Sequence, residues 1–319
     1  MSEHPHLPHM LPRGEALSLE QLYEKMALIR EVEERLLELF SQGKLFGTTH
    51  TYSGQETIAA GILSQLQPGD IVFSNHRCHG HYLAFTDDVE GLISELMGKR
   101  AGVCRGIGGS QHLCAKNIYT NGVLGSIMPN AVGMALAEKR QGRRSVTTVF
   151  LGDGAMGEGV VYESMNMAGL WSAPVLIVIE DNHYAQSTPS RLQVAGKLAD
   201  RPRAFGIATR EMAGNDVEEI HRAAGAILKE MREQPRPHCL VIDTYRLNPH
   251  SKGDDVRDKQ EIEAHRKADP LLATRGRLGG DAAMKIDDRC RQRVAAAIEK
   301  ALAADWADQS CLPGNLSVP

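Results

Sequence analysis

The chain has 319 residues, of which 42% are hydrophobic and 24% are charged, so it is long enough and apolar enough to bury a large core. Its 36 Lys and Arg residues against 40 Asp and Glu residues give a formal charge of −4, so neither nucleic acid nor an anionic membrane is expected as a partner. No apolar run approaches the roughly 20 residues of a membrane span, and the start lacks an apolar signal core, which predicts a cytoplasmic protein.

The first half of the chain predicts helices and one short strand. Residues 1–17 indicate a loose arm, followed by a single domain over 18–319 that ends in a helical extension. Ser18 and Gln21 form a capping-box pattern that begins a long amphipathic helix, and Gly43 ends it. Its predicted buried face consists of Leu22, Met26, Ile29, Leu36 and Phe40. A second helix follows residues 53–55, and a strand is expected at 71–73.

The second half alternates strands and helices. A helix is predicted at 129–140, with Pro129 tolerated in its first turn. Segments 146–151 and 175–179 are apolar and rich in β-branched residues, as strands buried on both faces should be. A helix at 216–233, a strand at 239–243 and a final helix at 282–304 follow, while 251–259 lacks apolar periodicity and predicts a mobile loop. The alternation predicts an α/β protein with a doubly wound parallel sheet.

Polar side chains follow two of these buried strands. Gly152-Asp153-Gly154 comes after the first, and Asp181-Asn182 comes after the second. Asp153 and Asn182 are separated by about the length of one βαβ unit, so both should lie at the carboxyl edge of the sheet, where ligands bind. Carboxylate and amide oxygens suit magnesium, and the glycines allow a sharp turn and the close approach of a phosphate. Taken alone, the Gly-Asp-Gly run is equally consistent with an ordinary turn.

Several separated segments resemble, in order, the alpha subunits of thiamine-diphosphate-dependent 2-oxo acid dehydrogenases and acetoin dehydrogenases. Residues 152–154 and 180–189 match the thiamine-diphosphate motif. Agreement continues at 50–56, 74–81, 105–112, 121–125, 244–246 and 250–251. The resemblance runs from about Leu22 to about Leu272. It implies the thiamine-diphosphate-binding fold and, within it, the domain that binds the diphosphate.

The resemblance also implies a role for each matching residue. Asp153, Asn182 and the main-chain carbonyl of Tyr184 would hold magnesium together with diphosphate oxygens. The other expected cofactor-binding residues are His76, Arg77, Gly122, Leu124, Gly152, Gly154, Ala155, Arg246 and His250. For Arg246 a surface salt bridge is the competing interpretation, and for Gly122 and Leu124 it is ordinary packing.

Two histidines are the expected catalytic residues. His250 matches the histidine that faces the reacting carbon, and a His suits this work because its pKa lies near neutrality. His50 would line the substrate pocket and bind a carboxylate or carbonyl group. The chain departs from the family pattern at three positions: His76 replaces a common Tyr, and Asn248 and Pro249 also differ. These departures bear on the loop conformation and the substrate contacts.

The activity implied by the resemblance needs more than this chain. Together with its partner chain, such an alpha subunit would decarboxylate a 2-oxo acid, either pyruvate or a branched-chain acid, or cleave acetoin, and the acyl unit would pass to a lipoyl acyltransferase. The alpha chain alone is expected to be inactive. A beta subunit would supply the catalytic glutamate and the pyrimidine-binding domain, in an assembly of two alpha and two beta chains. Two alternatives remain open. One is an acyloin-forming or transketolase-like thiamine enzyme half, and the other is a non-catalytic structural subunit.

Two further patterns are given simpler interpretations. The six cysteines are scattered and are expected to be reduced. Cys78 lies within the cluster from His76 to His81, which would permit a His and Cys metal site, but the family-like loop is favoured. Residues 106–109 are glycine-rich without a preceding strand, so we interpret them as a tight turn at a subunit contact and not as a nucleotide loop.

Overall fold

The computed structural model describes residues 17–251, 253 and 255–312. Most of the predicted N-terminal arm, residues 1–16, therefore lies outside the described residues, and so do positions 252 and 254 of the predicted loop. The division into an arm and one domain stays a prediction. No described helix is both long and apolar enough to cross a membrane.

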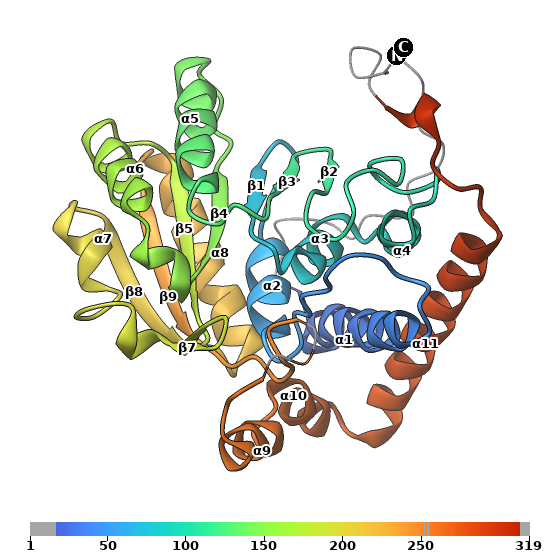
Figure 1. Ribbon diagram of the computed structural model, residues 1–319. Coiled ribbons are helices and arrows are strands. Elements are labelled where there is room, and N and C mark those ends of the chain that lie inside the picture. The colour runs from blue at the N-terminus through green and yellow to red at the C-terminus, as the bar shows by residue number, and fades with distance from the viewer. Residues whose placement is uncertain (1–16, 252, 254, 313–319) are drawn as a thin grey trace.

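A seven-stranded sheet forms the centre of the described structure, in the order β2-β3-β1-β4-β5-β9-β8 (Figure 1). Its strands are β1 Ile71–Ser74, β2 Cys114–Ala115, β3 Ile118–Thr120, β4 Thr147–Gly152, β5 Val175–Asp181, β8 Ala208–Ala213 and β9 His238–Asp243. Within this sheet the described strands pair in parallel, except for the antiparallel β2–β3 pair. A separate hairpin pairs β6 Tyr184–Ala185 with β7 Thr188–Pro189.

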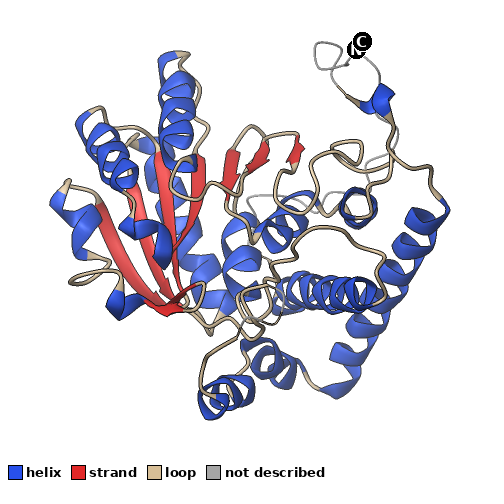
Figure 2. Ribbon diagram, in the orientation of Figure 1, coloured by secondary structure: helices blue, strands red, loops and turns tan. Residues whose placement is uncertain are grey.

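Helices cover both faces of the sheet (Figure 2). They are α1 Leu19–Ser41, α2 Glu56–Leu63, α3 Cys78–Thr86, α4 Val89–Leu96, α5 Ile127–Arg140, α6 Gly159–Leu170, α7 Asp200–Ala204, α8 Val217–Glu233, α9 Lys259–Lys267, α10 Pro270–Leu278 and α11 Gly280–Ala303. Short 3-10 turns occur at Asp153–Gly157, Ser190–Leu192 and Gln309–Cys311.

The two faces of the sheet carry separate apolar cores. Successive side chains of a strand point to opposite faces, and β4 shows this clearly. Phe150 packs into a core with α1, α2 and α8, whereas Val149 and Leu151 pack into a second core with α5 and α6. This two-sided burial explains why β4 and β5 read as continuous apolar runs in the sequence. It confirms the predicted doubly wound arrangement.

The strand order reverses between β1 and β4. From β1 the chain leads to β3 on one side, and from β4 it leads to β5 on the other. The loops that leave the carboxyl ends of β1 and β4 therefore separate and leave a crevice between them. Such a switch point is the usual ligand site of an open α/β sheet.

The longer elements predicted from the sequence are confirmed. Ser18 and Gln21 form both hydrogen bonds of the capping box, and α1 ends at Ser41, two residues before Gly43, whose φ is +69°. The predicted buried face of α1 is correct except for Phe40, which is only partly buried because it lies in the last turn at the edge of the core. The other predicted helices and strands begin and end within about two residues of their expected positions.

Several elements were not predicted. Helix α3 is buried along its whole length, so it lacks the alternation of apolar and polar faces that reveals a helix. Strand β8 lies at the edge of the sheet and buries only Met212, so its sequence reads as polar. The predicted loop after His250 gives way to α9 at Lys259. Directly after Asp153 the chain forms a 3-10 turn, and α6 begins only at Gly159.

Arg30 joins three helices through ion pairs. Its guanidinium contacts Glu56 of α2 at 2.6 Å and Asp269, which caps α10, at 2.7 Å. Both carboxylates are buried, so Arg30→Ala should lower the free energy of unfolding by roughly 3–5 kcal/mol. Arg35→Ala on the same helix removes an exposed pair with Glu38 and should cost about 0.5 kcal/mol. Urea denaturation of the full-length chain compares the two, and equal losses would refute the structural role of Arg30.

Candidate active site

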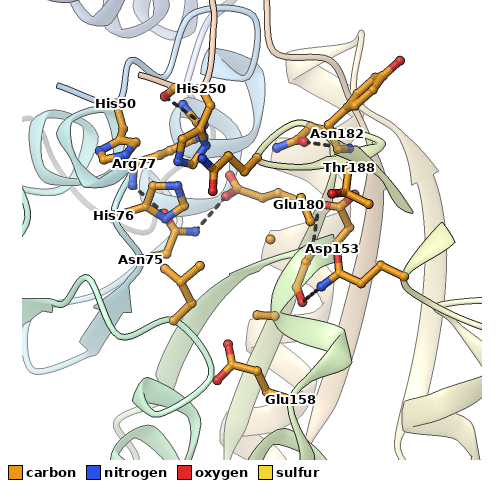
Figure 3. Close-up of a pocket in the computed structure, with 18 of the residues that line it drawn as sticks. His50, Asn75, His76, Arg77, Asp153, Glu158, Glu180, Asn182, Thr188 and His250 are labelled. Carbon is orange, nitrogen blue, oxygen red and sulfur yellow. Dashed lines mark hydrogen bonds between the residues drawn. The ribbon is translucent and has the colours of Figure 1, made fainter. Parts of the chain in front are cut away.

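A cavity of about 580 Å³ opens at the carboxyl edge of the sheet (Figure 3). That volume lies in the range of small-molecule sites. The cavity is lined by His50, Asn75, His76, Arg77, Gln111, Gly122, Leu124, Gly152, Asp153, Gly154, Ala155, Glu158, Glu180, Asn182, Tyr184, Ala185, Gln186, Thr188, Leu192, Gln193 and His250. Every site residue expected from the sequence lines it, except Arg246.

Sheet topology explains why residues so distant in sequence meet. His76 and Arg77 follow β1, Asp153 follows β4, and Asn182 follows β5, which are three adjacent parallel strands. In Figure 3 the histidines and Arg77 lie on one side of the cavity, and Asp153 and Asn182 lie on the other. The predicted convergence of the two motifs at one edge of the sheet is therefore correct.

Asp153 is a buried carboxylate with only neutral hydrogen-bond donors. It is 1% exposed, and it accepts hydrogen bonds from the Ser190 hydroxyl and, at 3.0 Å, from the Gly154 N–H. Among the described residues, no Lys or Arg forms an ion pair with it. Burial raises the pKa of the Asp153 carboxyl. A bound cation would stabilise the ionised carboxylate against this burial, so the site fits a divalent metal.

The side-chain amide of Asn182 is oriented by its neighbours. Its Nδ2 donates to Gln55 Oε1 at 3.2 Å, and its Oδ1 accepts from the Tyr184 N–H at 3.3 Å. An amide oxygen has two lone pairs, so Oδ1 can still coordinate a metal. The Tyr184 hydroxyl donates to Glu261 of α9 at 2.9 Å, which anchors the β6–β7 hairpin beside the cavity.

Arg77 places a buried positive charge in the cavity wall. It is 4% exposed, and its Nη1 donates to the carbonyl oxygen of Thr51 at 2.9 Å. Burial, together with the nearby guanidinium of Arg246, lowers the pKa of Arg77 to about 9. Two neighbouring cations of this kind are stabilised by an anion between them, and a diphosphate suits them well.

Arg246 lies behind the cavity wall. It is 2% exposed, and its Nη2 donates to the carbonyl oxygen of Gln186, a lining residue, at 3.0 Å. The interpretation of Arg246 as part of a surface salt bridge is wrong, because the side chain is buried. It acts on the cavity through its charge, which lowers the pKa of both His76 and Arg77.

Three histidines gather at one side of the cavity. They are His50, His76 and His250, and one ring nitrogen from each lies within 4.8 Å of the other two. Burial and the charge of Arg77 hold the pKa of His76 well below its ordinary value, so His76 is neutral at physiological pH. Neither of its ring nitrogens has a hydrogen-bond partner among the described residues, although both are buried. His76 is therefore available to a ligand.

Arg77 determines the tautomer of His250. Its Nη2 lies 3.1 Å from His250 Nδ1, and a guanidinium can only donate. Nδ1 is therefore the acceptor, and neutral His250 carries its proton on Nε2. A transition metal would need a bare Nε2, so this geometry favours a proton donor over a three-histidine metal site.

Glu180 was missed by sequence reasoning. It is 1% exposed, accepts from the Tyr52 hydroxyl, and lies 3.2 Å from His81 Nε2 and 3.3 Å from Asn75 Nδ2. Asn75 in turn accepts from the Arg77 N–H at 2.8 Å. This chain of contacts fixes the loop that carries Arg77. The one available signal was a Glu at the end of an otherwise apolar strand.

Gln111 and Glu158 were also missed, and both brace the loop at Gly122. Gln111 Nε2 lies 3.2 Å from His50 Nδ1, and a Cβ added to Gly122 would lie 2.2 Å from Gln111 Oε1. Glu158 accepts from the Gly125 N–H at 2.9 Å. Position 122 thus requires glycine, because the Gln111 side chain approaches its backbone closely. Neither Gln111 nor Glu158 could be identified from the sequence near Gly122, because both come from other segments of the chain.

Cys78 and the glycine-rich residues 106–109 both lie outside the cavity lining. Cys78 is buried and its thiol donates to the carbonyl oxygen of Ser110, and the His cluster found among the described residues, His50, His76 and His250, does not include it. Residues 106–109 form a turn, and the N–H groups of its three glycines, Gly106, Gly108 and Gly109, donate to the buried Glu95 carboxylate together with that of Cys104. The tight turn is confirmed, and its place at a subunit contact stays a prediction.

Fold and site together define a doubly wound α/β protein with a cavity at the switch point of its sheet, and the wall of this cavity includes the buried Arg77. Residues 24–310 match the family model described as "Dehydrogenase E1 component", and the chain belongs to this family. It is similar to the alpha subunit of acetoin:2,6-dichlorophenolindophenol oxidoreductase of Bacillus subtilis (strain 168), 34% identical over 305 residues, covering 92% of this chain and 91% of the relative.

Two other relatives agree with this placement. The alpha subunit of the Cupriavidus necator acetoin:2,6-dichlorophenolindophenol oxidoreductase is 38% identical over 290 residues, covering 88% of this chain and 87% of the relative. The pyruvate dehydrogenase E1 component subunit alpha of Zymomonas mobilis is 35% identical over 308 residues, covering 92% and 85%. The resemblance, the fold class and the assignment as an alpha subunit of a thiamine-diphosphate-dependent dehydrogenase are thereby confirmed.

Proposed function

We propose that this chain binds thiamine diphosphate through magnesium and acts on a 2-oxo acid or on acetoin, together with a beta subunit. The observation that carries the proposal is one cavity that joins a buried carboxylate, Asp153, which has no Lys or Arg partner among the described residues, to a buried cation, Arg77. A metal diphosphate would complement both groups at once, because the metal would bind the carboxylate and the phosphate oxygens would accept hydrogen bonds from the guanidinium.

Asp153, Asn182 Oδ1 and the Tyr184 main-chain carbonyl would hold the magnesium. Gly152, Gly154 and Ala155 form the turn beside it, and a Cβ added to Gly154 would lie 2.8 Å from the Cβ of Ala185, so a larger residue would disturb the turn. When bound, thiamine diphosphate supplies a carbon nucleophile and an electron sink. Gly122 and Leu124 would contact the organic part of the cofactor, since both line the same cavity.

His250 would serve as a proton donor to the reacting substrate. Arg77 keeps its proton on Nε2, and the ring centroids of His50 and His250 are 4.7 Å apart. The substrate oxygen would therefore lie near the imidazoles of His50 and His250 and near the neutral His76. General acid catalysis of this kind contributes typically about 10²–10⁴-fold to a rate.

A beta subunit is needed to complete the site. The relatives are named as alpha subunits. In this chain Val123 and Leu192 are 60% and 68% exposed beside the cavity, and exposed apolar side chains of this size fit a partner surface. We propose two alpha and two beta chains, with a lipoyl acyltransferase as the acyl acceptor. The cytoplasmic location expected from the sequence stays a prediction.

The test is a turnover assay of the chain copurified with its beta-type partner. We expect reduction of 2,6-dichlorophenolindophenol with acetoin, pyruvate or a branched 2-oxo acid, and we expect it to require both thiamine diphosphate and magnesium. Product analysis with and without a lipoyl acceptor distinguishes this activity from an acyloin-forming enzyme. A complex that binds no thiamine diphosphate would instead be a structural assembly, and the proposal would fail.

A further inference from the structure

Two cysteines outside the catalytic cavity approach each other. The Cys114 N–H donates to Cys104 Sγ at a nitrogen to sulfur distance of 3.1 Å. The same sulfur lies 3.4 Å from the His112 carbonyl oxygen and 3.8 Å from the Cys114 carbonyl oxygen. The side chain of Cys104 therefore points at the backbone of Cys114, across the loop that joins α4 to β2.

This geometry allows a disulfide. Since Cys104 Sγ lies 3.1 Å from the main-chain nitrogen of Cys114, the two Cα atoms are at most about 7.4 Å apart, so this contact is compatible with the usual separation of about 4.4–6.8 Å for a disulfide. The charge of a Cys114 thiolate is also near enough to contribute to the raised pKa of Cys104. Formation of the bond would require the exposed Cys114 side chain to rotate until its sulfur meets that of Cys104.

The loop between the two cysteines is already ordered by hydrogen bonds. The Glu95 carboxylate accepts from the N–H groups of Cys104, Gly106 and Gly108 at 2.7–2.8 Å. At the other end, Cys114 pairs with Tyr119 in the β2–β3 hairpin. Because both ends are held in place, bridging them costs little additional conformational entropy.

The two thiols differ in accessibility, which suits a two-step oxidation. Cys114 is exposed, whereas Cys104 is half-buried, and burial raises its pKa. The other four cysteines are buried: Cys78, Cys239, Cys290 and Cys311. An oxidant from solvent therefore meets Cys114 first, and Cys104 is the adjacent thiol that can resolve the product.

We propose that Cys104 and Cys114 form an intramolecular disulfide when the protein meets a hydroperoxide. The Cys114 thiolate attacks one peroxide oxygen, the O–O bond breaks, and a sulfenic acid and water form after protonation. The sulfur of Cys104 then attacks the sulfenic sulfur, forms the S–S bond and releases a second water. Two thiols are oxidised and one hydrogen peroxide is reduced to two waters.

The disulfide would link the chain's redox state to its active site. The closed ring contains Gln111, which lines the cavity and contacts His50. The pair thus constitutes an oxidation site on the loop that forms one wall of the cavity. This inference does not depend on the cofactor or substrate of the proposed function.

Hydrogen peroxide treatment of the copurified complex, followed by mass spectrometry without reduction, tests the proposal. We expect a product about 2 Da lighter, a peptide cross-link between Cys104 and Cys114, and reversal by dithiothreitol. In Cys104→Ser, oxygen should add to Cys114 instead, and in Cys114→Ser, oxidation of position 104 should slow at least tenfold. Cys311→Ser is the matched control and should form the same cross-link as the wild type.

Stepwise oxygen addition to Cys114 in the wild-type chain, with no cross-linked peptide, would overturn the proposal. A cross-link that joins Cys114 to a different cysteine would also overturn it. Because the readout is a mass and not a rate, failure here is distinguishable from failure of the proposed activity.

Discussion

Asp153→Ala should lower the affinity of the alpha and beta complex for thiamine diphosphate in the presence of magnesium by more than about 100-fold. The carboxylate is buried, and among the described residues it has no Lys or Arg partner, so its loss removes the charge that would hold the metal. Isothermal titration calorimetry with thiamine diphosphate and magnesium measures this directly. The variant should fold, because it removes a buried charge that has no Lys or Arg partner among the described residues, and burying such a charge is costly.

Asp243→Asn is the matched control for this prediction. Asp243 ends β9 at the same edge of the sheet, but its side chain is 67% exposed and it does not line the cavity. The control variant should bind the cofactor within about twofold of the wild type. Normal affinity in Asp153→Ala, or an equal loss in both variants, would contradict the assignment of Asp153 as a metal ligand.

His250→Asn should lower kcat by about 10²–10⁴-fold while cofactor affinity changes far less. The Asn side chain can still offer an oxygen to Arg77 Nη2, which lies 3.1 Å from Nδ1 in the wild type, but it cannot present the Nε2 proton. Steady-state kinetics and cofactor titration of the same preparation separate the two effects. A loss of cofactor affinity as large as the loss of turnover would show that His250 only holds the cofactor.

His183→Asn provides the corresponding control. His183 lies only one residue from Asn182, but its side chain is 47% exposed and does not line the cavity. Its φ of +68° also suits asparagine. Turnover of this variant should stay within about threefold of the wild type. If His183→Asn lowered turnover as much as His250→Asn, the effect of His250→Asn would have to be attributed to a general disturbance of this edge of the sheet.

The residue types and the topology of a parallel sheet were sufficient to predict that Asp153 and Asn182 lie together at one side of a cavity. Asp153 and Asn182 each follow an apolar, β-branched strand, and parallel strands bring their carboxyl ends to one edge. Because β4 and β5 are adjacent in the sheet, Asp153 and Asn182, which are about one βαβ unit apart in the sequence, lie near each other in space. The remaining assignments, such as Leu124 and His250, came from the resemblance, and the structure places both residues in the same cavity.

Contacts that loop residues make with residues distant in the sequence could not be predicted in this way. Gln111 reaches His50 across 61 positions, and Glu180 reaches Tyr52 across 128. Neither contact has a periodic signature, because loop side chains follow no fixed spacing. The burial of Arg246 was equally invisible, since a single Arg between strand and loop is usually exposed. Helices α3 and α4 were missed for the opposite reason, because nearly every side chain in them is buried.

The most direct test of the central claim is a crystal structure of the alpha and beta complex with thiamine diphosphate and Mn²⁺ in place of magnesium. We expect an anomalous peak within about 2.0–2.3 Å of both the Asp153 carboxylate and Asn182 Oδ1, with diphosphate oxygens completing the coordination. A peak elsewhere, or a diphosphate bound far from Arg77 with no metal beside Asp153, would contradict it.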